Sequence, residues 1–333
     1  MPSHTTTGAS TTATTLPLTL GSITSSNLLG IPDFVAGSMK FWIDASDLTT
    51  LFQENTGASA TTPAVLHGDP VGTIKDKSGN AKHGVADSNT YRANLDLQNS
   101  SGRPVIGKGW DCPPIDGIFP RYSVSGSTSY FKFMHSTTAT IFIVFRRKYV
   151  NRASVPGWIP SPLGTTNLGG AGIYITLHDN YGANRAYTSV NNTTPFTYVS
   201  QIYSGNNYIP GNAFCVLTTR IDFTSPGNYL MKQCVNAGTE LVGSNVSAPS
   251  TGNSYFDLRF GGYIGGGGAD GLIDTAETII FDTYFSDTQK TYVENYLMKK
   301  WLNLTNKLNT DDYLLTDDKT YLTDTSGNQL FWR

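Results

Sequence analysis

The stretch that decides the fold on its N-terminal side is Phe41-Trp42-Ile43-Asp44-Ala45-Ser46-Asp47. Phe41 and Ile43 point to one face of an extended chain and Trp42 points to the other, so a β-strand enters a hydrophobic core here. Asp44 and Asp47 suit the end of such a strand, because their short polar side chains hydrogen-bond nearby backbone groups. A loop then leads to a tight turn at Asp76-Lys77-Ser78-Gly79-Asn80, in which Gly79 or Asn80 can take a positive φ at little cost.

A second stretch, more than 200 residues later, marks the C-terminal side of the same domain. Thr278-Ile279-Ile280-Phe281-Asp282 is typical of a strand. Ser286 and Gln289 then form a capping box, which predicts a helix over residues 287–301. The apolar stripe of this helix consists of Tyr292, Val293, Tyr296, Leu297 and Trp301. The pattern predicts one helix that packs on a sheet.

The composition favours a β-rich protein and excludes several classes of function. Only 14% of the residues are charged, against roughly 25% in an ordinary soluble domain. The 23 basic and 25 acidic residues give a net charge of −2, so the chain has no basic field for nucleic acid. It has no run of 18 apolar residues, so we expect no membrane-spanning helix. Cys112, Cys215 and Cys234 lack the spacing of metal ligands and are expected to be buried and reduced.

The two stretches, with the strand at Phe41 to Asp47 and the strand and helix at Thr278 to Trp301, together resemble the laminin-G-like branch of the concanavalin A-like lectin family. This family occurs in phage virion proteins and bacterial surface proteins. The resemblance covers about residues 38 to 303. It implies an all-β jelly-roll sandwich with one C-terminal helix.

Two segments flank the expected sandwich. Residues 1–37 are of low complexity, rich in Thr, Ser, Ala and Leu, and cannot bury enough apolar surface to fold alone. We expect an extended arm that lies along another subunit and fills a groove with Leu16, Leu18, Leu20 and Leu28. Residues 304–333 contain the repeat Tyr313-Leu314-Leu315-Thr316-Asp317 and Tyr321-Leu322-Thr323-Asp324, which predicts a small β-hairpin or meander.

The sequence offers little for catalysis. A retaining glycosidase needs two carboxyl groups about 5 Å apart, and no two of the four glutamates share such a motif. Asp270 and Asp274 are the nearest substitute pair, and a polar loop is the favoured interpretation of both. The chain also lacks a Gly-x-Ser-x-Gly elbow and a His-Glu-x-x-His zinc motif, and its five histidines are scattered singly. We therefore expect no catalytic residues and no cofactor.

Calcium is the one metal ion for which the sequence offers candidate binding residues. Laminin-G-like modules often bind calcium at a rim of the sandwich, and Asp44, Asp47 and Asp76 are the matching carboxylates in this chain. Hard oxygen ligands are what calcium requires. Ordinary turn chemistry is the competing explanation of these three residues.

The region from Trp158 to Tyr208 carries the strongest indication of recognition. It is rich in Tyr, Asn, Gly and Ser, a composition typical of adaptable binding loops. Trp158 and Tyr181 are the candidate stacking residues for a glycan, with Asn180 and Asn184 as hydrogen-bonding partners. Alternatively, tyrosines such as Tyr174, in Ile173-Tyr174-Ile175, fill the core of the sandwich.

The resemblance therefore predicts a non-enzymatic structural protein of a tailed-phage virion, in a capsid decoration, head or tail fibre. We expect its partners to be other virion proteins, bound through the arm, further copies of itself and a host-surface glycan. No secretory signal peptide is recognisable, which favours assembly in the host cytoplasm and a place in the virion. A bacterial surface adhesin or carbohydrate-binding module is the alternative, and a glycoside hydrolase ranks third.

Overall fold

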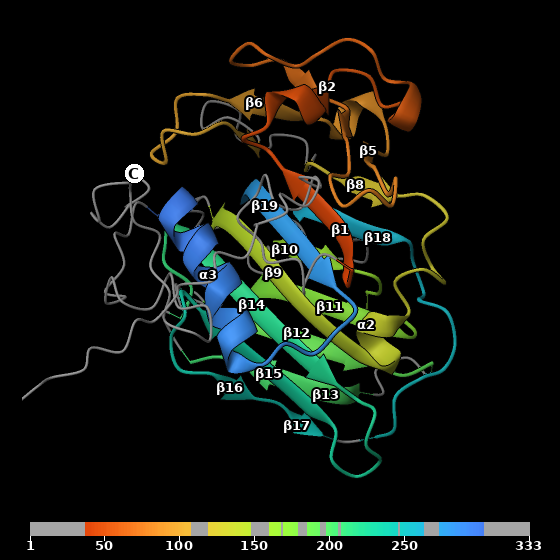
Figure 1. Cartoon of the computed structure of the whole chain (residues 1–333). Helices are drawn as coiled ribbons and strands as arrows, with labels where there is room; N and C mark the ends of the chain where they lie inside the picture. Colours follow the sequence, from red (N-terminus) through yellow and green to blue (C-terminus); the bar gives the residue numbers. More distant parts are fainter. Residues whose placement is uncertain are drawn as a thin grey trace, which may run out of the picture. The chain divides into compact units, whose positions relative to one another are not determined.

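The computed structural model describes residues 37–107, 119–147, 160–167, 169–178, 185–193, 198–205, 208–245, 247–262 and 273–302. The predicted N-terminal arm and C-terminal meander lie outside these ranges, so both stay predictions. The described chain forms two antiparallel β-sheets and one long helix (Figure 1). The predicted all-β sandwich with a C-terminal helix is thus confirmed.

The first sheet, sheet A, has the order β16-β15-β14-β9-β19-β7-β6-β3, and β1 also pairs with β19. Its strands are β1 (Met39–Asp44), β3 (Pro70–Val71), β6 (Ala93–Asp96), β7 (Val105–Gly107), β9 (Thr138–Arg147), β14 (Phe214–Asp222), β15 (Leu230–Val235), β16 (Leu241–Val242) and β19 (Ile273–Phe281). The predicted strands at both ends of the domain are neighbours, because β1 pairs antiparallel with β19 from Met39 to Asp44.

The second sheet, sheet B, has the order β17-β13-β12-β11-β10-β18-β8-β5-β4-β2. Its strands are β2 (Leu51–Phe52), β4 (Thr73–Ile74), β5 (Gly84–Ala86), β8 (Tyr122–Val124), β10 (Ser161–Gly164), β11 (Gly172–His178), β12 (Arg185–Asn191), β13 (Tyr198–Tyr203), β17 (Ser244–Asn245) and β18 (Leu258–Gly262). Short helical turns connect the strands: η2 (Leu48–Thr50), η3 (Gly57–Ser59), η4 (Asn89–Tyr91) and α2 (Phe133–Ser136).

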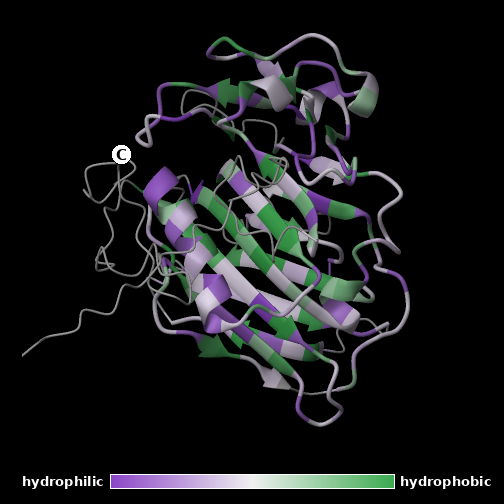
Figure 2. Ribbon diagram, in the orientation of Figure 1, coloured by the Kyte–Doolittle hydropathy of each residue, from purple (hydrophilic) through white to green (hydrophobic). Residues whose placement is uncertain are grey.

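The core lies between the sheets and follows the alternation of the strands. Phe41 and Ile43 belong to the main core cluster, whereas Trp42 points to the opposite face of sheet A. In Figure 2 hydrophobic residues concentrate along β9, β14 and β19, and hydrophilic residues are frequent on α3 and the loops. Cys215 and Cys234 are buried free thiols, as predicted, and burial raises the pKa of each; Cys112 lies outside the described residues.

The helix α3 spans Asp287–Trp301 and packs against β9 and β14 of sheet A (Figure 1). Its predicted capping box is present: the Ser286 hydroxyl accepts a bond from the Gln289 N–H, and the Gln289 side chain accepts one from the Ser286 N–H. Among the helices that the structure describes, none is long and apolar enough to cross a membrane.

Candidate functional site

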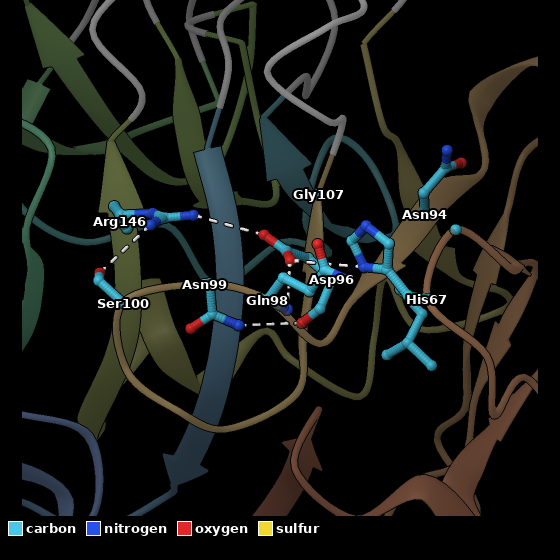
Figure 3. A pocket seen from close by; sticks show the side chains of 10 residues that line it. His67, Asn94, Asp96, Gln98, Asn99, Ser100, Gly107 and Arg146 are labelled. Atoms are coloured by element: carbon cyan, nitrogen blue, oxygen red, sulfur yellow. Dashed lines mark hydrogen bonds and ion pairs between the residues drawn. The ribbon is translucent and has the colours of Figure 1, made fainter.

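A polar pocket of about 270 Å³ opens beside β6 and β7, near the end of β9 (Figure 3). The side chains that give it its chemistry come from four segments: the loop before β3, strand β6, the loop after β6, and β9. They are His67, Asn94, Asp96, Gln98, Ser100 and Arg146.

Arg146 anchors the inner wall of this pocket. It stands directly opposite Asp274 of β19 in the antiparallel ladder, and opposite Phe214 on its other side. Its guanidinium donates to Asp274 through Nε at 2.7 Å and also through Nη2, and lies 5.0 Å from the centroid of the Phe214 ring. Its Nη1 donates to the Ser100 hydroxyl at 3.3 Å, and Nη2 lies 3.6 Å from an Asp96 oxygen. The arginine is therefore fixed from several directions, which a preorganised binding wall requires.

Gly107 of β7 makes room for this ion pair. Asp274 is fully buried, and a Cβ atom on residue 107 would lie 2.0 Å from its Oδ1. Real carbon atoms do not approach oxygen so closely, so only glycine permits the carboxylate to lie against β7. The pocket wall depends on this close approach.

The outer wall is a loop stiffened by its own side chains. Asp96 accepts a bond from the Gln98 N–H at 2.9 Å, and the Asn99 amide donates to the Asp96 carbonyl at 2.9 Å. His67 accepts a bond from the Leu97 N–H through Nδ1 at 3.2 Å, which assigns the proton of a neutral ring to Nε2. The side chains that line the pocket are thus presented by a loop of defined shape.

The lining suits a small polyhydroxylated ligand. Asn94, Gln98 and Ser100 are exposed, and each offers both a donor and an acceptor, while Asp96 adds acceptors and Arg146 adds donors. The volume lies just below the roughly 300–1,000 Å³ of pockets for drug-sized ligands, so a single sugar ring is the appropriate size.

The three carboxylates predicted to bind calcium have protein partners. Asp44 and Asp47 both bind the Lys77 ammonium, at 3.0 Å and 2.8 Å, and Asp44 also binds Lys300 at 2.9 Å. Burial alone would raise the pKa of Asp44, but the charges of Lys300 and Lys77 outweigh it and hold the pKa below its usual value. For Asp47, burial is likewise outweighed, by hydrogen bonds from Lys77 and Thr49, so its pKa is also lowered.

Asp76 serves the predicted turn. Its carboxylate accepts bonds from the N–H groups of Trp42, Ser78 and Lys82, and Gly79 has the predicted positive φ of 87°. Within the described ranges, no group of three or more His, Cys, Asp or Glu side chains could hold a metal ion. In the structure Asp44 and Asp47 therefore pair with lysine, and Asp76 holds the turn. Calcium binding stays a prediction.

The predicted glycan residues Trp158, Asn180, Tyr181 and Asn184 lie outside the described residues, and so do Leu16, Leu18, Leu20 and Leu28. Their roles stay predictions. The alternative prediction is that tyrosines such as Tyr174 fill the core of the sandwich. Tyr174 is buried, but it clusters with Tyr187 and Tyr198 rather than with the main core. Because Ile173 and Ile175 enter the core, Tyr174 points to the other face of sheet B.

Sequence reasoning missed the pocket. Asp274 was expected in a polar loop, and this is wrong: it lies within β19, paired with Arg146 at a separation of 128 residues. The signal was the basic end of an otherwise apolar strand, Thr138–Arg147, because a buried cation in a sheet requires an acidic partner. Which acidic residue serves depends on strand order, which the sequence pattern does not show.

Comparisons with known proteins concern the fold. No family model matches the chain, and no curated protein matches it. The binding domain of Paraclostridial Mosquitocidal Protein 1 is similar in structure, with a TM-score of 0.50 and 12% identity over 80% of this chain and 53% of that one.

Two botulinum neurotoxin structures give lower scores. The binding domain of serotype D has a TM-score of 0.47 and 9% identity, covering 79% of this chain and 53% of that one. A structure of type C, a neurotoxin whose cell entry is described as dependent upon interaction with two ganglioside molecules, has a TM-score of 0.46 and 12% identity, covering 79% of this chain and 52% of that one. The chain thus spans about half the length of these structures. At such identities the likeness is one of β-sandwich fold, and it does not test the resemblance to phage proteins.

Proposed function

We propose that this chain is a non-enzymatic adhesion domain that binds one sugar residue of a surface glycan in the pocket of Arg146. The observation that carries the proposal is the combination of a rigid, ion-paired inner wall with exposed amide and hydroxyl groups at hydrogen-bonding positions around a hollow of sugar size. The structures similar in fold are described as binding domains, which agrees with this proposal.

A place in a phage virion is the second part of the proposal. It is supported by the low-complexity segment of residues 1–37, which cannot bury enough apolar surface to fold alone. In this view the arm joins the domain to other virion proteins and to further copies, and the sandwich faces the host surface. A surface adhesin of a bacterium would use the same pocket.

A glycoside hydrolase is disfavoured by the arrangement of the two carboxylates near the pocket. Asp274 is fully buried and its Oδ2 accepts both bonds from the Arg146 guanidinium, and Asp96 lies beside the same guanidinium. Hydrolysis requires one carboxyl group to protonate the leaving oxygen. Neither side chain is placed to do so, because both are committed to the arginine.

The test is a glycan array, followed by titration of the best ligand. Asn94→Ala combined with Gln98→Ala removes two exposed side chains from the pocket without touching the ion pair, and should weaken binding at least tenfold, a change of about 1.4 kcal/mol. Asn228→Ala, at an exposed asparagine in the loop before β15, is the matched control and should bind as the wild type does.

Three outcomes would overturn parts of the proposal. Unchanged binding by the Asn94→Ala, Gln98→Ala double variant would show that the pocket is not the binding site. Loss of binding in Trp158→Ala alone would show that the glycan binds at the predicted loops. Release of reducing sugar from the bound glycan would show a hydrolase.

A further inference from the structure

Tyr255, in the segment before β18, is an exposed aromatic residue whose ring lies against the backbone of two glycines. It is 52% exposed, and a Cβ on Gly170 would lie 2.7 Å from its Cδ2, while one on Gly169 would lie 3.0 Å from its Cε1. Cδ2 and Cε1 are opposite corners of the ring. The ring therefore lies against the Gly169–Gly170 backbone and also contacts the Phe256 ring, with 4.6 Å between the ring centroids, while about half of the residue stays exposed.

The seat of the ring is held by hydrogen bonds. The Tyr255 N–H donates to the Ala171 carbonyl at 2.8 Å, and the Thr166 hydroxyl donates to the Gly170 carbonyl at 2.9 Å. The Asn167 side chain accepts a bond from the Gly169 N–H at 3.3 Å. The backbone of Tyr255 and the loop beneath its ring are thus held by hydrogen bonds where β10 and β11 are connected, so little conformational freedom is lost when a ligand stacks on the ring.

Two buried polar side chains in the backbone segments next to Tyr255 lack partners in the described part of the chain. Asn191 of β12 is fully buried and stands opposite Gly172, next to the residue that binds the Tyr255 N–H. Within the part of the chain that the structure describes, neither amide atom of Asn191 has a hydrogen-bond partner, nor does the hydroxyl of the buried Ser254. Unpaired buried groups are costly, and ordered water or ligand hydroxyls commonly satisfy them.

We infer that Tyr255 is a stacking platform for a neutral sugar ring, and so a second saccharide subsite distinct from the pocket of Arg146. A pyranose has one face of C–H groups, which suits the exposed part of the tyrosine ring, and hydroxyls at its edge, which suit uncharged amide and hydroxyl groups reached through ordered water. The side chains assigned to the subsite, Tyr255, Asn191 and Ser254, are all uncharged. The glycine pair is part of the subsite, because any side chain at position 170 would push the ring away.

The test is a titration of the full chain with lactose, maltose, cellobiose and diacetylchitobiose, observed by NMR shifts of the amides of Tyr255, Gly169 and Gly170. At least one disaccharide should shift these amides. Tyr255→Ala should weaken its binding at least fivefold, and Gly170→Ala should do the same by displacing the ring. Tyr203→Ala is the matched control, because Tyr203 is also strongly exposed, at 63%, and binding should be unchanged.

The result distinguishes this subsite from the proposed pocket. Binding at Tyr255 should persist in the Asn94→Ala, Gln98→Ala double variant. The inference is overturned if none of the four disaccharides shifts these amides, or if Tyr255→Ala binds as tightly as the wild type. Thermal unfolding of each variant identifies any loss that is due to misfolding; should Gly170→Ala unfold, Tyr255→Phe, which retains the ring, must still bind.

Discussion

Glu277 of β19 ties the helix α3 to sheet A, and its replacement by glutamine should weaken the fold strongly. The carboxylate is fully buried and accepts four bonds: from the indole N–H of Trp42 at 2.8 Å, from that of Trp301 at 2.7 Å, from the Lys300 ammonium at 2.8 Å and from the Tyr296 hydroxyl at 3.3 Å. Burial raises the pKa of Glu277, but all four donors bind the ionised form. Glutamine preserves the shape of this side chain and removes half of its acceptors.

The magnitude follows from the donors that lose their partner. A glutamine oxygen can serve two of the four donors, while its NH₂ group faces the other two, and each unsatisfied buried donor costs about 1–3 kcal/mol. Lys300 keeps its bond to Asp44 at 2.9 Å, which limits the loss. We therefore expect Glu277→Gln to lower the free energy of unfolding by about 3 kcal/mol, toward the low end for a broken buried ion pair.

Urea denaturation and thermal unfolding measure this effect. About 3 kcal/mol corresponds to a melting temperature lower by roughly 6 to 12 °C in a domain of this size. Glu54→Gln is the comparison, because the Glu54 carboxylate accepts bonds from Thr61 and Thr62 of an exposed loop, so the same substitution there should cost much less than Glu277→Gln. If Glu277→Gln melts within 1 °C of the wild type, the bonds to Glu277 contribute nothing net and the reasoning is refuted.

Two further predictions concern acid stability and the pocket wall. The pKa values of Asp44 and Asp47 are lowered in the fold, so the unfolded chain binds more protons below their ordinary value of 3.8, and stability should fall as the pH drops through that region. Glu277, with its raised pKa, acts in the opposite sense, but burial lowers the pKa of His135 to about 4, so the unfolded chain also binds more protons below about pH 6.5. Urea midpoints should therefore decline from about pH 6.5 downward and continue to fall below pH 4; midpoints that stay constant from pH 7 to pH 4 would contradict this. Gly107→Ala should destabilise the domain by about 2 kcal/mol or more in urea, because its Cβ would meet the buried Asp274 carboxylate; unchanged stability would show that β7 can shift freely.

The sequence by itself determined the local elements. Alternation placed Phe41 and Ile43 in the main core and Trp42 on the opposite face of the strand, since neighbouring side chains on a strand point to opposite faces. The capping box at Ser286 and Gln289 fixed the start of α3, because the orphan N–H groups of a helix are satisfied by residues close in sequence. Such features depend on a few neighbouring residues, and a single sequence contains them.

Tertiary structure alone decided which distant residues meet. Arg146 faces Asp274 across 128 residues, and Trp42 reaches Glu277 across 235. The sequence indicated neither pairing, because pairing follows from strand order and register. A shift of one residue would turn every side chain of a strand to the other face. The pocket and the seat of Tyr255 both depend on that register, which is set by packing of the whole sandwich and not by any local pattern.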